Sequence, residues 1–162
     1  MDWIKQKKSY LEKLLDIVKR KRDETHKHYK DAQERANEAE GAMISRYDTF
    51  KEEGQYLAEG LKIKYHELRT AALEIESILK DIKLKESDLV QHYSIVAGEF
   101  DTTEEFQYFI SPYMGGEKID METTIVSPSS PIGKSLFGKR EDDQFEFIVD
   151  KKVKKGEITF VV

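Results

Sequence analysis

Cysteine is absent from this 162-residue sequence, and proline is rare. Without thiolates the chain has neither a disulfide framework nor a cysteine-ligated metal site, which fits a reducing compartment. The three prolines all follow residue 111, so the first two thirds of the chain contain no strong helix breaker. No apolar run approaches the roughly 18 residues that cross a bilayer, and the first residues lack the apolar stretch of a signal peptide. We therefore expect a soluble, cytoplasmic protein with no membrane partner.

Acidic residues outnumber basic ones, and the excess is unevenly distributed along the chain. The net charge is −5, yet residues 1–30 contain ten Lys or Arg and five Asp or Glu. Residues 31–60 contain three and eight, and residues 88–162 contain eight and fourteen. Such a chain is a poor general nucleic-acid binder, because phosphate affinity needs a clustered basic surface. The basic run 19–22 is interpreted as a solvated helix face, with a contact to RNA as the alternative.

Two amphipathic stripes occupy the first half of the chain. The first repeats every seven residues, which predicts a long helix. The second advances in alternating steps of three and four, the pattern of a coiled coil. The first stripe consists of Ile4, Leu11, Val18, Thr25, Ala32 and Ala39, with Ala36 beside it, and the second of Tyr47, Phe50, Gly54, Leu57, Leu61, Tyr65, Leu68, Ala72, Ile75, Leu79 and Ile82.

The two stripes have similar lengths and are joined by a short segment near residues 41–46, which predicts an antiparallel hairpin over residues 1–84. At 1.5 Å per residue, the hairpin would be roughly 50–60 Å long. Small residues near the turn (Ala32, Ala36 and Ala39) would let the two helices approach closely. The alternative is a coiled coil between two chains.

After Lys85 the apolar period changes from helical to two, which predicts a second domain over residues 88–162. Five alternating or β-branched segments indicate a small sheet: 93–97, 106–110, 123–126, 145–149 and 158–162. Turn signals lie at Ser111-Pro112, at Gly115-Gly116 and over Lys151–Gly156. The fold class expected is therefore α+β, a helical hairpin followed by a small antiparallel or mixed sheet.

One short helix is predicted between Ser130 and Phe137. Ser129 or Ser130 can cap its start, and Pro131 suits its first turn because proline fixes a helical φ angle there. Gly138 suits the position at which the helix stops.

The stretch from Ser127 to Phe145, with the sequence SPSSPIGKSLFGKREDDQF, resembles the C-terminal signature of the GreA/GreB family. The order is a Ser-Pro-Ile-Gly-Lys helix, a Leu-x-Gly-Lys stop, an acidic turn and an alternating strand. The resemblance implies an FKBP-like domain that docks near the outer rim of the secondary channel of RNA polymerase. Ser130, Pro131, Lys139 and Arg140 are the docking residues that it suggests.

The segment from Arg46 to Gly60 resembles the tip of Gre-family coiled coils. The resemblance implies that the tip, near residues 41–53, enters the secondary channel, where its carboxylates help to hold a magnesium ion of the polymerase during hydrolysis of backtracked RNA. Asp48, Glu52 and Glu53 are the candidate acids, and Asp48 and Glu52 the candidate magnesium ligands. One or two supplementary carboxylates suffice for such an ion. On the sequence alone, a solvated acidic cap is the alternative.

The spacing of the tip acids differs from the family pattern, in which the paired acids are closer together than Asp48 and Glu52. Members that enter the channel and inhibit or modulate transcription without cleavage are therefore the competing model. In either case the resemblance implies a monomer with no catalytic centre or cofactor of its own, in indirect contact with nascent RNA. DNA binding is a further expectation attached to the family.

Other functions have weaker support in the sequence. No nucleophile elbow, phosphate loop or zinc motif is present, and His26, His28, His66 and His92 are interpreted as structural. An FKBP-like domain also raises peptidyl-prolyl isomerase or chaperone activity. The aromatic residues of the sheet (Phe106, Tyr108, Phe145 and Phe147) are expected to fill its core rather than to line a pocket. A plain coiled-coil scaffold would leave the Ser127–Phe145 signature unexplained.

Overall fold

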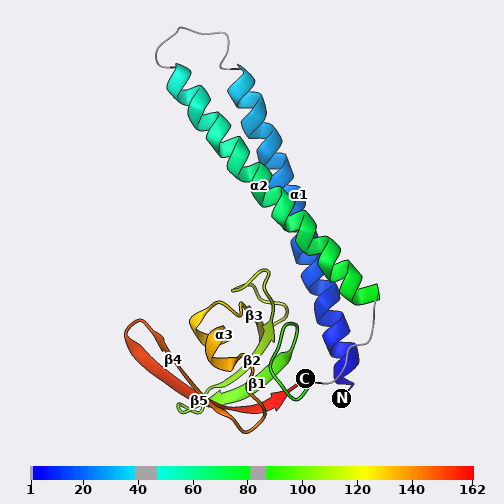
Figure 1. The fold of residues 1–162 in the computed structure, drawn as a ribbon, viewed down its shortest axis with the longest axis vertical. Coiled ribbons are helices and arrows are strands. Elements are labelled where there is room, and N and C mark those ends of the chain that lie inside the picture. Colours follow the sequence, from blue (N-terminus) through cyan, green and yellow to red (C-terminus); the bar gives the residue numbers. More distant parts are fainter. Residues whose placement is uncertain (1, 39–46, 81–86) are drawn as a thin grey trace. The chain divides into compact units, whose positions relative to one another are not determined.

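The computed structural model describes the backbone of residues 2–38, 47–80 and 87–162, and their side chains except those of Glu38 and residues 47–50. Helix α1 spans Trp3–Glu38 and helix α2 spans Tyr47–Lys80 (Figure 1). None of the described helices is long and apolar enough to cross a membrane. The chain divides into two compact units, Leu15–Ser77 and Met1–Leu14 with Ile78–Val162. The prediction of domains at 1–84 and 88–162 stays a prediction.

In the Leu15–Ser77 unit, α1 and α2 pack against each other in antiparallel order. The Lys19 ammonium lies 2.7 Å from a carboxylate oxygen of Glu76. Further along, the rings of His26 and Tyr65 are 4.8 Å apart, and Gly54 faces Ala36. The contacting residue numbers on α2 decrease as those on α1 increase, so the two helices are antiparallel. One chain therefore supplies both helices of the coiled coil. The predicted hairpin is confirmed.

The interior of this unit narrows toward the turn between α1 and α2. Leu68 and Ile75, whose side chains are large, are buried farther from the turn. Nearer the turn the buried residues are alanines, and a Cβ on Gly54 would lie 3.3 Å from the Ala36 Cβ. The close approach expected from small residues is therefore present.

The predicted stripe is wrong at Leu57, whose side chain is 59% exposed. The buried position in this turn of α2 belongs to Ala58. Where the helices approach as closely as Gly54 and Ala36, only small side chains fit between them, and Leu57 lies at the margin.

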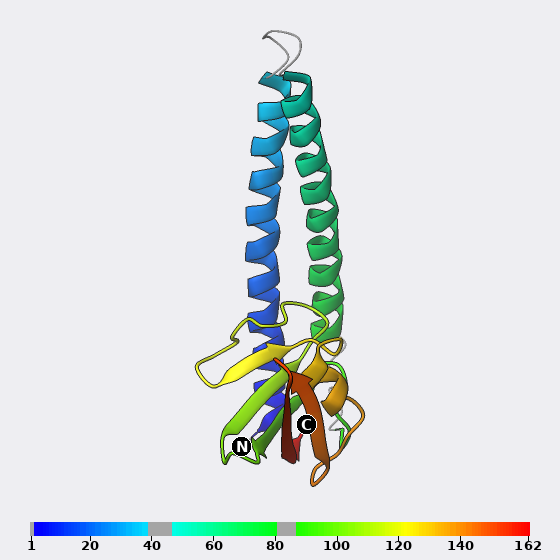
Figure 2. The same cartoon turned by 90° about the vertical axis from the view of Figure 1, so that its left-hand side faces the viewer.

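The second unit contains a five-stranded sheet with the order β3-β2-β1-β5-β4 (Figure 2). The strands are β1 (Ile95–Phe100), β2 (Glu105–Ile110), β3 (Thr123–Val126), β4 (Gln144–Val149) and β5 (Lys152–Val161). The β2–β3 pair is parallel, and the other neighbours are antiparallel. The predicted mixed sheet is confirmed.

The turn predicted over Lys151–Gly156 is wrong in extent. The chain reverses at Asp150 and Lys151, both with positive φ angles, and β5 begins at Lys152. Two consecutive residues with positive φ are typical of a type I′ hairpin, whose twist matches that of the flanking strands. Gly156, interpreted as part of the turn, lies inside β5, where a Cβ would clash with the carbonyl oxygen of Glu99.

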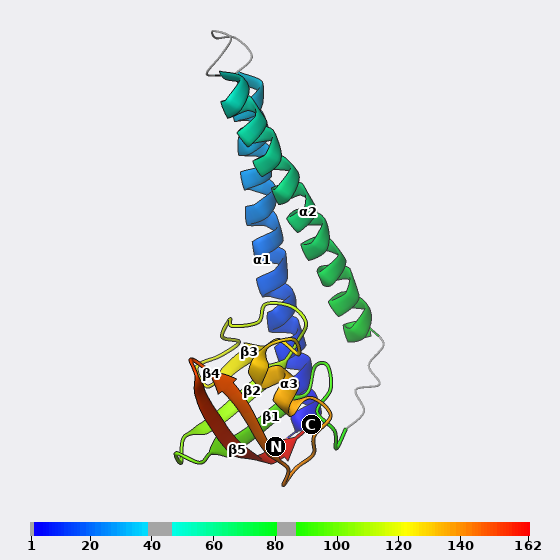
Figure 3. The ribbon, with the colours of Figure 1, turned by 60° about the vertical axis from the view of Figure 1, so that its left-hand side comes forward.

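One face of the sheet is covered by the short helix α3 (Pro131–Leu136), as Figure 3 shows. Leu136 is fully buried in a cluster with apolar residues from all five strands. Phe106 and Phe145 are 8% and 4% exposed in this cluster, and Tyr108 and Phe147 pack against it. The aromatic residues therefore form the core, as expected.

The opposite face is covered by the first turns of α1. The ring of Trp3 lies 4.1 Å from that of Phe160, and Tyr10 meets Phe109 edge-on at 5.7 Å. The Tyr10 hydroxyl is 2.9 Å from the hydroxyl of Thr123 and accepts a hydrogen bond from Gln107. Residues of the predicted hairpin thus belong partly to the compact unit of the sheet, which the periodicity alone did not indicate.

Candidate functional site

The start of α3 is built by serine side chains. Ser130 has an extended backbone, and its hydroxyl accepts a hydrogen bond from the Gly133 N–H at 3.1 Å. The same hydroxyl donates to the carbonyl oxygen of Ser127 at 2.7 Å. Pro131 follows at the first helical position, where its missing N–H costs nothing. The predicted cap is confirmed at Ser130.

The third residue of α3 must be glycine. A Cβ on Gly133 would lie 1.9 Å from the carbonyl oxygen of Ser127 and 3.0 Å from the Cα of Pro128. The loop before the helix therefore packs directly on the helix backbone. Within the loop, the hydroxyls of Ser127 and Ser129 are 2.8 Å apart. The Ser-Pro-Ile-Gly order has a steric basis: the serine caps, the proline starts and the glycine admits the preceding loop.

The exit from α3 is also fixed by backbone contacts. Gly138 has a φ of +80°, a conformation that glycine adopts without strain. Its N–H donates to the carbonyl oxygen of Val90, and the Val90 N–H donates to that of Lys139, both at 2.8 Å. Phe137, just before the turn, is 43% exposed and lies 5.4 Å from the His92 ring. The predicted stop at Gly138 is confirmed.

The four predicted docking residues lie at opposite ends of α3. Ser130 and Pro131 are at its start, whereas Lys139 and Arg140 follow its end. A six-residue helix is about 9 Å long, so the two pairs can contact one partner surface only if that surface spans the helix. Pro131 and Arg140 are exposed, while Ser130 and Lys139 are half-buried.

Exposure of two apolar side chains of the sheet unit, one directly after α3 and one on the turn before β3, was not predicted. One is Phe137, and the other is Met121, which is 92% exposed. Met121 projects from a turn in which a carboxylate oxygen of Asp120 accepts hydrogen bonds from the N–H groups of Glu122 and Thr123. Partial burial raises the pKa of Asp120, but hydrogen bonds from Tyr10, Thr123 and Glu122 outweigh it and hold the pKa below its usual value. Met121 lies outside the alternating apolar segments, so the sequence pattern does not predict whether its side chain is buried or exposed.

The acidic tip is described only in part. Helix α2 begins at Tyr47, so positions 48 and 52 are one helical turn apart. Glu52 and Glu53 are exposed. The side chain of Asp48 and residues 41–46 of the predicted tip lie outside the described part of the structure.

Among the described residues, no three His, Asp or Glu side chains gather closely enough to hold a metal ion. Exposed glutamates such as Glu52 and Glu53 fit a magnesium site only as additional ligands to an ion held mainly by another protein.

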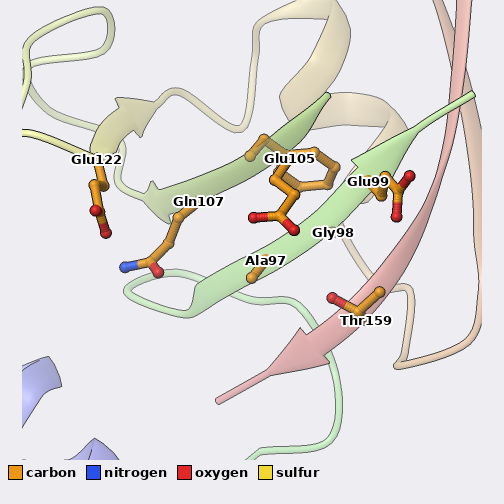
Figure 4. A pocket seen from close by; sticks show the side chains of 8 residues that line it. Ala97, Gly98, Glu99, Glu105, Gln107, Glu122 and Thr159 are labelled. Carbon is orange, nitrogen blue, oxygen red and sulfur yellow. The ribbon is translucent and has the colours of Figure 1, made fainter. Parts of the chain in front are cut away.

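A shallow depression of about 540 Å³ on the sheet carries three glutamates (Figure 4). Glu99 on β1 is directly opposite Glu105 on β2, and Glu122 lines the same depression. On its other side, Glu99 is opposite Glu157 of β5. Like charges across a sheet repel each other and repel phosphates. The expectation of DNA binding therefore has no support on this face.

Two of the four residues in the basic run 19–22 of α1 form ion pairs within the Leu15–Ser77 unit. Lys19 pairs with Glu76, and Arg22 pairs with Asp23 at 2.7 Å. Arg20 and Lys21 are exposed. This arrangement agrees with a solvated helix face.

Residues 85–161 match the family model described as "Transcription elongation factor, GreA/GreB, C-term". None of the curated proteins compared with the chain matches it.

Solved structures similar to the chain include the Gfh1 proteins of Thermus thermophilus and Thermus aquaticus and the GreA/GreB elongation factor of Nitrosomonas europaea. The first is 15% identical with a TM-score of 0.39 and covers 91% of this chain and 94% of its own. The second is 16% identical with a TM-score of 0.39, covering 93% and 94%. The third is 21% identical with a TM-score of 0.38, covering 56% and 78%. The relation to the GreA/GreB family rests on the match of residues 85–161 to the family model.

Proposed function

We propose that the chain is a Gre-family transcription elongation factor that works through the secondary channel of RNA polymerase, because residues 85–161 match the GreA/GreB C-terminal family model. In this proposal the domain of residues 88–162 docks at the channel rim through the ends of α3. The hairpin of residues 1–84 enters the channel with its tip. The chain has no active centre of its own and acts on the polymerase.

The observation that carries the proposal is the combination of this domain with a hairpin of two helices longer than 30 residues. Helices of 36 and 34 residues are about 50 Å long. A pair of helices is also narrow, because each has a diameter of about 10–12 Å with its side chains. This geometry suits delivery of the exposed Glu52 and Glu53 into a channel that excludes a globular domain.

Two outcomes inside the channel are compatible with these residues. In the first, Asp48 and Glu52 add ligands to a magnesium ion of the polymerase, and the factor stimulates cleavage of backtracked RNA. In the second, the tip occupies the channel without stimulating cleavage and inhibits or modulates transcription. The spacing of Asp48 and Glu52, wider than that of the family's paired acids, favours the second outcome.

The polymerase interaction is tested by pull-down of core RNA polymerase with the full chain, followed by crosslinking from a photoreactive probe at position 48. The proposal requires binding and crosslinks to polymerase segments next to its active site. Binding without such crosslinks would contradict entry of the tip. No binding at all would contradict the proposal as a whole.

The two outcomes are separated with stalled, backtracked complexes. Release of short 3′ RNA fragments that is lost in Asp48→Ala and Glu52→Ala variants supports the carboxylate mechanism. Release that these variants leave unchanged contradicts it. If the chain causes no release but slows elongation, it is a channel modulator. Glu59→Ala, an exposed acid two turns further along α2, is the matched control.

A peptidyl-prolyl isomerase activity is not part of the proposal. The aromatic side chains that would line its pocket are packed together, with the rings of Phe106 and Phe145 5.5 Å apart in the core. A proline-peptide isomerisation assay checks this directly.

A further inference from the structure

Strand β4 lies at one end of the sheet, and no strand in the described part of the chain pairs with its outer edge. An edge strand in antiparallel pairing directs every second N–H and C=O group away from the sheet. Proteins usually protect such edges with proline, lysine or a bulge within the strand. Within β4, whose sequence is QFEFIV, Glu146 is the one charged residue and proline is absent. The edge is therefore open to a further strand.

The opposite end of the sheet differs from this edge. There β3 has four residues, and Thr124 forms a bridge with Lys118 in the preceding segment. The shorter strand is partly covered by its own chain. The open edge at β4 is thus a specific feature and not a general property of this small sheet.

Aliphatic side chains are exposed beside the open edge. Ile148 of β4 is 65% exposed, and its cross-strand partner Val153 is 57% exposed. Val149 is 38% exposed. Branched aliphatic side chains have high strand propensity. Each of them would gain free energy if it were buried against another apolar surface. A protein surface can bury such aliphatic side chains, whereas the charged phosphates of a nucleic acid cannot. The expected partner is therefore a protein.

Charge changes sign along β4. The turn before the strand is acidic, with Glu141, Asp142 and Asp143 in succession; the turn after it consists of Asp150 and Lys151, and Lys152 follows at the start of β5. All except the half-buried Asp143 are exposed. Consider a second strand that also has acidic residues before it and lysines after it. If this strand paired antiparallel to β4, acidic residues would lie opposite basic ones at both ends.

The strand that has this polarity is β4 of a second copy of the chain. We propose that β4 is a self-association edge, in which two copies pair antiparallel about a two-fold axis at Phe147. In this register Phe147 lies opposite Phe147 of the second copy, Glu146 opposite Ile148, and Asp143 opposite Lys151. Two-fold symmetry makes each contact occur twice.

Neighbouring registers are less favourable. Directly opposite side chains of paired strands lie on the same face of the sheet. The register can therefore change only in steps of two residues. A shift one way places Glu146 opposite Glu146 of the second copy. A shift the other way places Glu146 opposite Asp150. Like charges directly opposite each other destabilise a sheet, so the register centred on Phe147 is selected.

The association differs from the monomer expected from the sequence, and it does not rest on the proposed function. A single strand pair buries much less than the roughly 1,200 Å² of a stable interface. The dimer should therefore form at high protein concentration and dissociate on dilution.

The test is sedimentation equilibrium of the full chain over a wide concentration range, with two variants at one exposed position. Ile148→Glu places a second carboxylate opposite Glu146 at both symmetric contacts and should weaken dimerisation roughly tenfold or more. Ile148→Lys removes the same aliphatic side chain but places an ammonium opposite Glu146, so it should dimerise better than Ile148→Glu. Circular dichroism confirms that both variants are folded.

A second measurement uses the absence of cysteine in the chain. The two Cα atoms of residue 147 in the paired strands would be about 4.5 Å apart, a distance that a disulfide spans. Phe147→Cys should form a covalent dimer on mild oxidation. Val153→Cys, which is more exposed but one strand inward, should form much less. A wild-type chain that remains monomeric at all concentrations overturns the proposal. Equal weakening by Ile148→Glu and Ile148→Lys, or equal crosslinking at 147 and 153, overturns the β4 register.

Discussion

The carbonyl oxygen of Ser127 lies where the side chain of residue 133 would begin. A Cβ at Gly133 would come within 1.9 Å of it, well inside van der Waals contact. The neighbour is backbone, which cannot rotate away as a flexible side chain does. The loop 127–130 and helix α3 are therefore fitted to each other through the absence of one methyl group.

Gly133→Ala should destabilise the sheet domain by about 2 kcal/mol or more, because the loop must separate from α3 and expose the buried Leu136. Urea unfolding, followed by circular dichroism, measures the change. Ser135→Ala in the same helix is the control, since Ser135 is half-buried and its hydroxyl donates to the local carbonyl oxygen of Ile132. A loss at Gly133 no larger than this control would mean that the contact with Ser127 relaxes at little cost.

Gly60→Ala should have the opposite sign. Gly60 lies inside α2, and a Cβ there would meet nothing within 4 Å. Alanine is about 1 kcal/mol more favourable than glycine in a helix interior, so the hairpin should gain close to that amount. Thermal unfolding of the full chain checks it. Gly54→Ala is the matched comparison and should gain less, because its Cβ would crowd Ala36 at 3.3 Å.

Lys7→Met should stabilise the protein at neutral pH. Lys7 is 4% exposed, and burial lowers its pKa below the ordinary value for lysine. Between the lowered folded pKa and the unfolded pKa near 10.4, the unfolded chain binds more protons, so the wild-type protein gains stability as pH rises. Methionine removes the desolvation cost, on the order of 1 kcal/mol.

The advantage of Lys7→Met over the wild type should shrink as pH rises toward the unfolded pKa. Denaturant unfolding between pH 7 and 10 measures this trend. Lys8→Met, at an exposed neighbour, should show no such dependence. An advantage that stays constant with pH would mean that packing of the methionine, and not removal of the charge, is responsible.

Arg140→Ala combined with Lys139→Ala should weaken binding to core RNA polymerase several-fold at low salt. Charges at the rim of an interface act mainly on the association rate, and salt screens them. The effect should therefore decline as ionic strength rises. Surface plasmon resonance at two salt concentrations measures both rate constants. Lys152→Ala, which removes an exposed charge from β5, serves as the comparison and should leave binding unchanged.

Local chemistry made α3 and the hairpin predictable. Ser130, Pro131 and Gly138 each act within one or two helical turns, so their order along the chain is enough to locate the helix. The heptad spacing from Val18 to Ala32 likewise reports a helix face, and it indicated where the hairpin interior is small. Four strands followed from their period of two, and β3 followed from its run of β-branched residues.

Other features depend on partners that are remote in the sequence. Leu57 fits the apolar pattern but is exposed, because the close approach of Gly54 and Ala36 leaves room only for Ala58. Gly156 resembled a turn residue, yet it lies in β5 because Glu99 on β1 approaches it. In both cases the deciding neighbour is on another element.

By itself the sequence determined the helical hairpin, the strands and the cap of α3, since periodicity and capping act over a few residues. The tertiary structure decided which residues meet across the chain. It placed Tyr10 against Thr123, 113 residues away, placed Gly156 against Glu99 of β1, and left β4 at the open end of the sheet. These outcomes depend on strand order and on the packing of distant segments, for which no local pattern exists.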